Sequence, residues 1–273
     1  MKLTDAIKKD AIKTGAKIQA SDAAQLEKIL NKTFYLERNL DKELEFLKHV
    51  MTRGQKTTER KGLHASAIIV SDKKFCLRQQ VLSLLYHQLQ GEQINVSLKR
   101  IFEEGNAIHE KWQRLFVRAN FSEPTELDKT MESKRYQLSY TPDIICKIPE
   151  FYNGLMIGEI KSANTFQFKK MERHPSAYKQ LQLYMYLSGI EKGFVLCEDK
   201  NTQDFKVEVY DFDINIVDPF INRLKQIKQG YDNVFAKHKM VKRPSDAVNA
   251  TCKRCVGCPM HIACWTPSQA VRL

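Results

Sequence analysis

The feature that most constrains the fold is a pair of strand-like segments on either side of an Asn-Gly turn. Residues 138–148 and 155–161 are rich in β-branched and alternating apolar side chains, and Asn153-Gly154 lies between them. An Asn-Gly pair between such segments is typical of a two-residue hairpin turn. We therefore expect two antiparallel neighbouring strands that are joined at Asn153-Gly154.

A helical pattern precedes this hairpin. Residues 97–119 place their apolar side chains on one stripe, and the members of that stripe are Ile101, Ile108, Trp112 and Leu115. His109 lies beside the stripe, on the side of Phe102 and Phe116. The pattern therefore predicts a helix in which His109 lies at the edge of a buried face.

Helix and strand patterns also follow the hairpin. Residues 177–189 are typical of a helix that ends at Gly189, and strand patterns follow at about 194–198 and 205–211. The order helix, strands, helix, strands predicts an α/β fold, with a mixed β-sheet flanked by helices.

The N-terminal part of the chain has a different composition. Residues 1–62 are polar and helical in pattern, with apolar residues three and four positions apart: Ile18, Leu26, Ile29, Leu30 and Phe34. The charged segment 54–62 is bracketed by glycines, which indicates a loop. We therefore expect a helical N-terminal extension over 1–62 and a second domain over 63–273.

Charge and composition limit the class of protein. The 273 residues include 44 Lys and Arg against 32 Asp and Glu, a formal net charge of +12 that favours a polyanionic partner. No apolar run approaches the ~20 residues of a membrane span. The charged N-terminal segment lacks the apolar stretch of a signal peptide, so we expect a cytoplasmic protein with no membrane partner.

Two acids and a lysine lie around the predicted hairpin. Pro142-Asp143 ends one strand region, and Glu159-Ile160-Lys161 lies on the next, where Glu159 and Lys161 share a face. Two carboxylates that the hairpin brings together repel each other unless a divalent cation lies between them, and hard oxygen ligands suit Mg²⁺ or Mn²⁺. A lysine on that face can orient water and counter the charge of a phosphate. The pattern predicts a phosphodiester hydrolysis site, against the alternative of a solvated strand edge.

The same residues resemble the PD-(D/E)XK nuclease superfamily. The resemblance implies a restriction-endonuclease-like mixed β-sheet flanked by helices, and catalysis by Asp143, Glu159 and Lys161. It implies a Mg²⁺- or Mn²⁺-dependent deoxyribonuclease. The metal ligands implied are His109, Asp143, Glu159 and the Ile160 carbonyl.

Two further motifs resemble the RecB-type branch of this superfamily. Gly105 and His109 match its Gly-x-x-x-His helix, in which the histidine is an additional metal ligand; the alternative is a histidine hydrogen-bonded at a helix edge. Gln180 and Tyr184 match its Gln-x-x-x-Tyr motif, and residues four apart share one side of a helix. The resemblance implies that both contact the nucleic-acid substrate; the alternative is a helix that packs into the core.

Cysteines cluster near the C-terminal end, and an odd total of seven in a reducing compartment favours metal ligands over disulfides. Cys255, Cys258 and Cys264 follow a Cys-x2-Cys-x5-Cys spacing, and Cys76 lies far upstream after Ser71-Asp72, which we expect to cap a helix. This arrangement resembles the iron–sulfur nucleases of the RecB-type branch, such as the AddB-type and CRISPR-adaptation exonucleases. The resemblance implies that Cys76 and the three cysteines of this C-terminal Cys-rich segment together hold a [4Fe–4S] cluster.

A zinc site is the alternative, because Cys252 with Cys255, Cys258 and Cys264 can form a local four-thiolate Zn²⁺ site. In that case Cys76 is a buried thiol. Cys146 and Cys197 fall on predicted strands, where we expect them to pack as small apolar side chains.

The resemblance implies an exonuclease that acts on single-stranded DNA or on free ends, in recombination, repair, CRISPR adaptation or phage DNA processing. No Gly-x4-Gly-Lys-Ser/Thr phosphate loop is present in the sequence, so a helicase or recombination protein is a possible partner. The alternative is a DNA-binding recombination scaffold that does not cut and that carries a structural zinc or iron–sulfur site.

Overall fold

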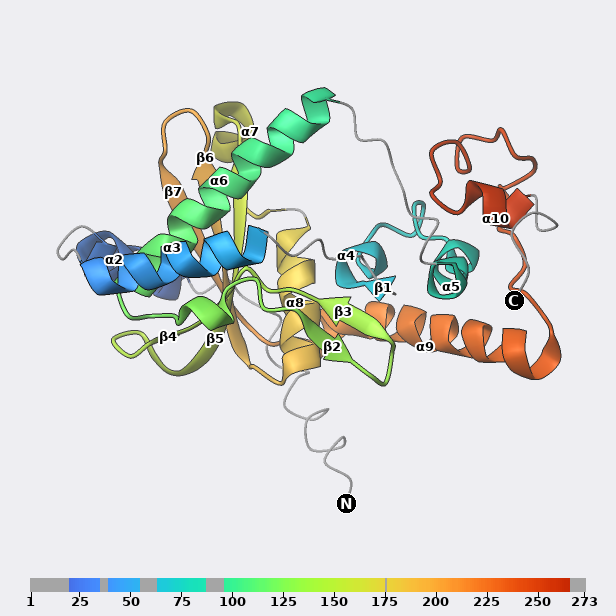
Figure 1. Cartoon of the computed structure of the whole chain (residues 1–273), viewed down its shortest axis with the longest axis horizontal. Coiled ribbons are helices and arrows are strands. Elements are labelled where there is room, and N and C mark those ends of the chain that lie inside the picture. The colour runs from blue at the N-terminus through green and yellow to red at the C-terminus, as the bar shows by residue number, and fades with distance from the viewer. Residues whose placement is uncertain (1–19, 35–38, 55–62, 87–95, 175, 266–273) are drawn as a thin grey trace, which may run out of the picture. The chain divides into compact units, whose positions relative to one another are not determined.

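The computed structural model describes residues 20–34, 39–54, 63–86, 96–174 and 176–265 (Figure 1). The chain divides into two compact units that each combine non-contiguous segments. The first unit comprises Met1–Thr57, Val96–Thr130 and Thr141–Val217, and the second comprises Thr58–Asn95, Met131–Tyr140 and Asp218–Leu273. The predicted domain boundary at residue 62, most of the predicted 54–62 loop, and Ile18 lie outside the described residues. Within the described parts of the chain, no helix has the length and apolarity to cross a bilayer.

The first unit is built on a four-stranded sheet with the order β4-β5-β6-β7. Its strands are β4 (Ile144–Ile148), β5 (Tyr152–Ala163), β6 (Lys192–Asp199) and β7 (Phe205–Asp211). The β4–β5 and β6–β7 pairs are antiparallel, and the β5–β6 pair is parallel. The predicted α/β fold class, a mixed sheet flanked by helices, is confirmed.

The predicted antiparallel hairpin is confirmed, but the predicted position of its turn is wrong. The chain turns at residues 149–151, where the Phe151 N–H donates to the Ile148 carbonyl at 2.9 Å, and Asn153-Gly154 lies inside β5. Pro149 suits the turn because its ring restricts φ and it has no N–H to pair.

The register of the hairpin explains this choice. Cys146 pairs with Met156, and both side chains are buried in the core. A turn centred on Asn153-Gly154 would instead place Cys146 opposite Lys161. Since a one-residue slip exchanges the two faces of a strand, burial of the apolar face outweighs the local turn preference.

The predicted strand over 138–148 is interrupted at residues 141–143. Leu138–Tyr140 forms β3, which belongs to a separate three-stranded sheet with the order β1-β3-β2. Pro142 lies in the interruption, where a residue without an N–H cannot continue a ladder of hydrogen bonds. The interruption leaves Asp143 just before β4 and outside the regular strand.

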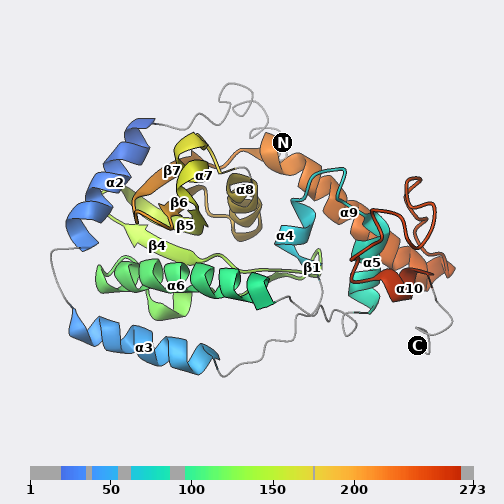
Figure 2. The same ribbon diagram turned by 90° about the horizontal axis from the view of Figure 1, so that it is seen from above.

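Helices cover both faces of the first unit's sheet. Figure 2 shows α6 (Val96–Arg118) on one face, with α3 (Leu40–Gly54) outside it, and α8 (Ala177–Ser188) on the other face. α2 (Ala20–Phe34) packs against β7 and α6. The short α7 (Thr165–Lys170) follows β5 directly. The described part of residues 1–62 is therefore helical in α2 and α3, as expected.

Apolar side chains of α2 and α6 meet those of the sheet in one core. Leu26, Leu30 and Phe34 of α2 are buried as predicted, and the Phe116 ring stacks on Phe194 at 5.6 Å between centroids. Burial of each such side chain stabilises the fold by about 1.5–3 kcal/mol. The predicted α6 stripe is wrong at its first residue, because Ile101 is 53% exposed.

The predicted end of α8 at Gly189 is confirmed. Gly189 has φ +76°, in the left-handed region that favours glycine, and its N–H donates to the Met185 carbonyl at 2.9 Å. This cap ends α8 and directs the chain into β6.

The described part of the second unit contains the three-stranded sheet, three short helices and most of the long helix α9. Its elements are β1 (Leu63–His64), α4 (Ala65–Ile68), α5 (Leu77–Leu85), β2 (Met131–Ser133), β3, most of α9 (Ile214–Lys237) and α10 (His261–Trp265).

The prediction that Ser71-Asp72 caps the helix that follows is wrong, because α5 begins at Leu77 and Cys76 is its N-cap. The Ser71 carbonyl instead accepts from the N–H groups of Lys74 and Phe75 in a turn, and Asp72 pairs with Arg223.

Candidate active site

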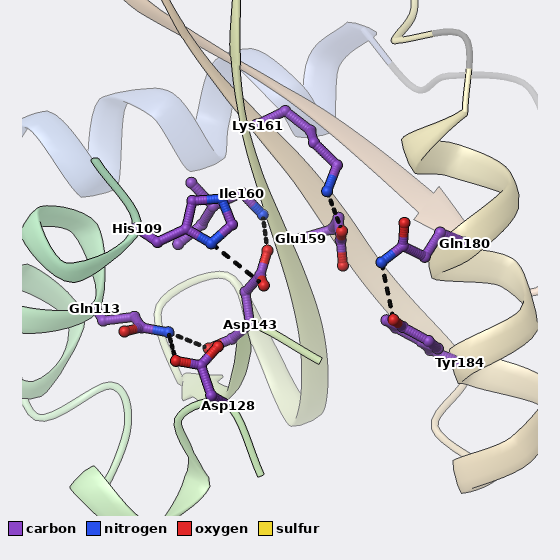
Figure 3. Close-up of polar contacts among 9 residues, drawn as sticks. All are labelled: His109, Gln113, Asp128, Asp143, Glu159, Ile160, Lys161, Gln180 and Tyr184. Atoms are coloured by element: carbon purple, nitrogen blue, oxygen red, sulfur yellow. Dashed lines mark hydrogen bonds and ion pairs between the residues drawn. The ribbon is translucent and has the colours of Figure 1, made fainter. Parts of the chain in front are cut away.

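The β4–β5 register brings the two predicted acids together. Ile144 pairs with Gly158, so Asp143 lies across from Glu159, one residue beyond the last pair. The N–H of Ile160 donates to Asp143 Oδ2 at 2.7 Å (Figure 3). Asp143 is 8% exposed and Glu159 is 0% exposed, so both carboxyl groups are removed from bulk water.

Glu159 and Lys161 lie on the same face of β5, as predicted. The Lys161 ammonium forms an ion pair and a hydrogen bond with Glu159 Oε1. Ile160 points to the opposite face and is part of the core with α2 and α6. The alternation of a strand thus separates the charged pair from the core side chain between them.

The two carboxyl groups have opposite pKa shifts. Burial and the negative charge of Asp143 raise the pKa of Glu159 to about 7. For Asp143, burial is outweighed by the hydrogen bond and charge of His109, the charge of Lys161 and the Ile160 N–H, so its pKa is lowered. Two acids whose environments separate their pKa values in this way are typical of a catalytic site.

His109 reaches the acids from α6. Its Nδ1 lies 3.4 Å from Asp143 Oδ1, and its side chain is 27% exposed. Burial acts to lower the pKa of His109, but the hydrogen bond and charge of Asp143 outweigh burial and raise it. The predicted position at the edge of a buried face is confirmed. A side chain at Gly105, one turn earlier, would meet open space, so steric crowding does not require a glycine there.

Lys161 keeps its positive charge in this buried setting. Burial acts to lower its pKa, but the charges of Glu159 and Asp143 outweigh burial and raise it. An ammonium group is therefore held beside the two carboxylates.

Gln180 and Tyr184 approach the acids from α8. Gln180 Nε2 donates to the Tyr184 hydroxyl at 2.8 Å, as their four-residue spacing predicts. Tyr184 is 4% exposed, and burial followed by the charge of Glu159 raises the pKa of its hydroxyl. Figure 3 shows both residues on the opposite side of Glu159 from His109.

Gln113 is a residue at this site that was not predicted. It is 0% exposed, one turn after His109 on α6, and its Nε2 donates at 2.9 Å to both Asp128 Oδ2 and the Asp143 carbonyl. A polar residue between the buried Trp112 and Phe116 was the signal in the sequence that could have identified it. Gln113 ties α6 to the backbone of Asp143.

The oxygen donors fit a hard divalent cation chemically. Glu159 Oε2 is buried and accepts no hydrogen bond from any described residue, and burial and the charge of Asp143 destabilise the ionised form of this carboxyl group. In the described part of the chain, however, no group of three or more His, Cys, Asp or Glu side chains is arranged to hold a metal ion. Instead Glu159 pairs with Lys161, and Asp143 pairs with His109.

Five cysteines gather in the second unit. Burial first, and then the charges of Cys76 and Cys264, raise the pKa of Cys258. The thiol of Cys255 hydrogen-bonds Cys252 and lowers the pKa of Cys252. Cys76 is therefore within electrostatic reach of the C-terminal thiols. The two segments are distant in sequence, since Arg78, two residues after Cys76, is 186 residues from Cys264. Cys146 and Cys197 are buried in the first unit, as predicted.

Arginines connect the two segments that carry these thiols. Arg254 donates to the carbonyls of Phe75 and Lys73 at 3.0 and 2.9 Å, and Arg78 Nε donates to Cys264 Sγ at 3.2 Å. The thiolate donor set suits an iron–sulfur cluster or zinc. The contacts favour neither Cys76 nor Cys252 as the fourth ligand.

Comparisons with known proteins give distant structural likenesses. LHK-Exo, an alkaline exonuclease from Laribacter hongkongensis, shares 16% identity and a TM-score of 0.44, over 65% of this chain and 93% of its own. The structure of LHK-Exo in complex with dAMP shares 14% identity and a TM-score of 0.46, over 63% of this chain and 88% of its own. The structure of SSO0001 shares 16% identity and a TM-score of 0.41, over 68% of this chain and 87% of its own. No family model and no curated protein matches the sequence.

Proposed function

We propose that the protein is a divalent-metal-dependent deoxyribonuclease that hydrolyses phosphodiester bonds. The observation that carries this proposal is the buried pair Asp143 and Glu159, with Lys161 beside it and one oxygen of Glu159 without a hydrogen-bond partner among the described residues. A buried acid of raised pKa next to a second acid is costly to keep ionised unless a cation joins them. A solvated strand edge, the alternative, would leave these side chains exposed.

His109, Asp143, Glu159 and the Ile160 carbonyl would hold Mg²⁺ or Mn²⁺. When bound, such an ion stabilises charge on the phosphate and makes water more acidic. Lys161 holds its proton beside Glu159 and would place positive charge against a phosphate oxygen. The Ile160 N–H and His109 orient the two oxygens of Asp143. Gln180 and Tyr184, fixed by their mutual hydrogen bond, would contact the DNA strand.

For the substrate we propose DNA, as single strands or free ends attacked by an exonuclease. The net charge of +12 supports a polyanion, and such binding weakens as salt rises because counterions are released. Recombination, repair, CRISPR adaptation or phage DNA processing in the cytoplasm, with a helicase or recombination partner, are the settings that the sequence resemblance supports.

For the cysteines we propose a [4Fe–4S] cluster held by Cys76, Cys255, Cys258 and Cys264. The sequence resemblance supports Cys76 over Cys252 as the fourth ligand, and the arginine contacts between the two segments are compatible with this set. Anaerobically purified protein should be brown and contain about four irons per chain. Colourless protein with stoichiometric zinc would instead support the site that includes Cys252.

A cleavage assay tests the nuclease proposal. Wild-type protein with Mg²⁺ or Mn²⁺ should degrade single- or double-stranded DNA and stop when EDTA is added. Asp143→Asn and Glu159→Gln should abolish cleavage but keep most DNA binding. A protein that binds DNA and never cuts it, with either metal, would support the recombination scaffold instead.

A further inference from the structure

The surface of α7 combines an exposed aromatic ring with positive charge. Phe166 is 74% exposed, and the Lys170 ammonium lies 5.7 Å from its ring centroid. Lys169 and Lys170 are exposed, and neither forms an ion pair with any described residue. Residues 164–174 carry three basic side chains and one acidic side chain. We call Phe166, Lys169 and Lys170 the α7 patch.

Hydrogen bonds hold α7 at both ends. The Thr165 hydroxyl donates to Asp199 Oδ1 at 2.9 Å at the start of the helix. At its end, Lys206 Nζ donates to the carbonyls of Phe168 and Met171, both at 2.6 Å. The exposed ring of Phe166 is thus carried on a fixed backbone, so a contact with it costs little conformational entropy.

The α7 segment follows closely after Lys161. The chain reaches Phe166 five residues after Lys161, a span of at most ~18 Å. α7 also packs against β5, the strand that carries Lys161. His174 follows α7, and burial and then the charge of Lys161 lower its pKa to about 4. α8, which carries Gln180 and Tyr184, starts directly afterwards.

We propose that the α7 patch is a stacking site for an unpaired base of a single-stranded DNA substrate. Every base has a π-face that an exposed aromatic ring can stack on, whatever the sequence. Lys169 and Lys170 supply the charge that the flanking phosphates require. Stacked nucleotides rise about 3.4 Å each, so the base would lie within about five nucleotides of the phosphate at Lys161. This inference rests on the proposed nuclease function, because it extends the path of the same strand.

Binding in EDTA buffer tests the patch without cleavage. The probes are fluorescein-labelled oligothymidylates, one intact and the others with a single abasic residue at successive positions. Phe166→Ala should weaken binding of the intact strand about 5- to 150-fold, the range measured for loss of one base–aromatic stack. Phe166→Trp should bind at least as tightly as wild type. One abasic position should weaken binding by wild type and have no effect on Phe166→Ala.

Leu155→Ala is the matched control, since Leu155 is 55% exposed on the same strand as Lys161 but near its other end. It should bind within about twofold of wild type. Equal affinities of wild type and Phe166→Ala, or an equal loss in Leu155→Ala, would overturn the stacking site. Base-dependent binding through Phe166 in a protein that never cuts DNA would support the patch and overturn only the nuclease proposal.

Discussion

Replacement of Gln113 by methionine tests whether the link from α6 to Asp143 stabilises the candidate site. Gln113 is fully buried, and its amide donates to Asp128 Oδ2 and to the Asp143 carbonyl, both at 2.9 Å. Methionine has a similar volume and no donor. Gln113→Met therefore leaves one buried and one partly buried acceptor without this donor and changes the packing little.

The magnitude follows from the hydrogen bonds that are lost and kept. A buried acceptor that loses its donor costs about 1–3 kcal/mol. The Asp143 carbonyl still accepts from the Asp128 N–H at 3.2 Å. The Gln113 Oε1 has no hydrogen-bond partner in the described part of the chain, so removing that oxygen offsets part of the loss. We expect Gln113→Met to lower the free energy of unfolding by about 2 kcal/mol.

Urea denaturation, monitored by fluorescence, measures this loss of free energy of unfolding. Arg114→Ala is the control, because Arg114 is the exposed neighbour on α6 and its loss should change stability by less than about 0.5 kcal/mol. Below the unfolding transition, Gln113→Met should also cut DNA more slowly, since the backbone of Asp143 is less well held. A wild-type denaturation midpoint for Gln113→Met, or an equal loss in Arg114→Ala, would refute the reasoning.

Three further predictions follow from the charges and thiols. Lys161→Met should lower kcat for DNA cleavage by about 10²–10³-fold, with Mn²⁺ binding retained; an unchanged kcat would exclude a catalytic role. Since the folded pKa of His174 is about 4, below the ~6.5 of the unfolded chain, stability should fall as the pH drops from 6.5 to 4. Between pH 7.5 and pH 5, His174→Gln should lose up to about 1 kcal/mol less free energy of unfolding than wild type, as measured by urea denaturation. Identical pH profiles of the two proteins would contradict this prediction. Cys76→Ser should lower the iron content and Cys252→Ser should not; the reverse pattern would make Cys252 the fourth ligand in place of Cys76.

Local patterns predicted the parts of the site that depend on one strand or one helix. The alternation at Glu159-Ile160-Lys161 separates the charged face from the core, and it is independent of where the hairpin turns. Gly189 ends its helix because its positive φ is a property of that residue and its immediate hydrogen bond. Such features follow from short-range geometry, which a sequence specifies directly.

Features that depend on distant partners were predicted less well. The prediction of a turn at Asn153-Gly154 was wrong because the buried pairing of Cys146 with Met156 sets the register. Gln113 was missed because its partners, Asp128 and Asp143, are contributed by segments 15 and 30 residues away. No periodicity in the sequence encodes these pairings.

The central claim is that Asp143 and Glu159 bind a divalent cation together. The most direct measurement is a titration of the protein with Mn²⁺, in which electron paramagnetic resonance reports the free ion. We expect saturable Mn²⁺ binding by wild type that is lost in Asp143→Asn and in Glu159→Gln, while Arg114→Ala binds as wild type does. Wild-type protein that binds no Mn²⁺, or variants that bind it equally well, would show that these two acids do not hold the ion.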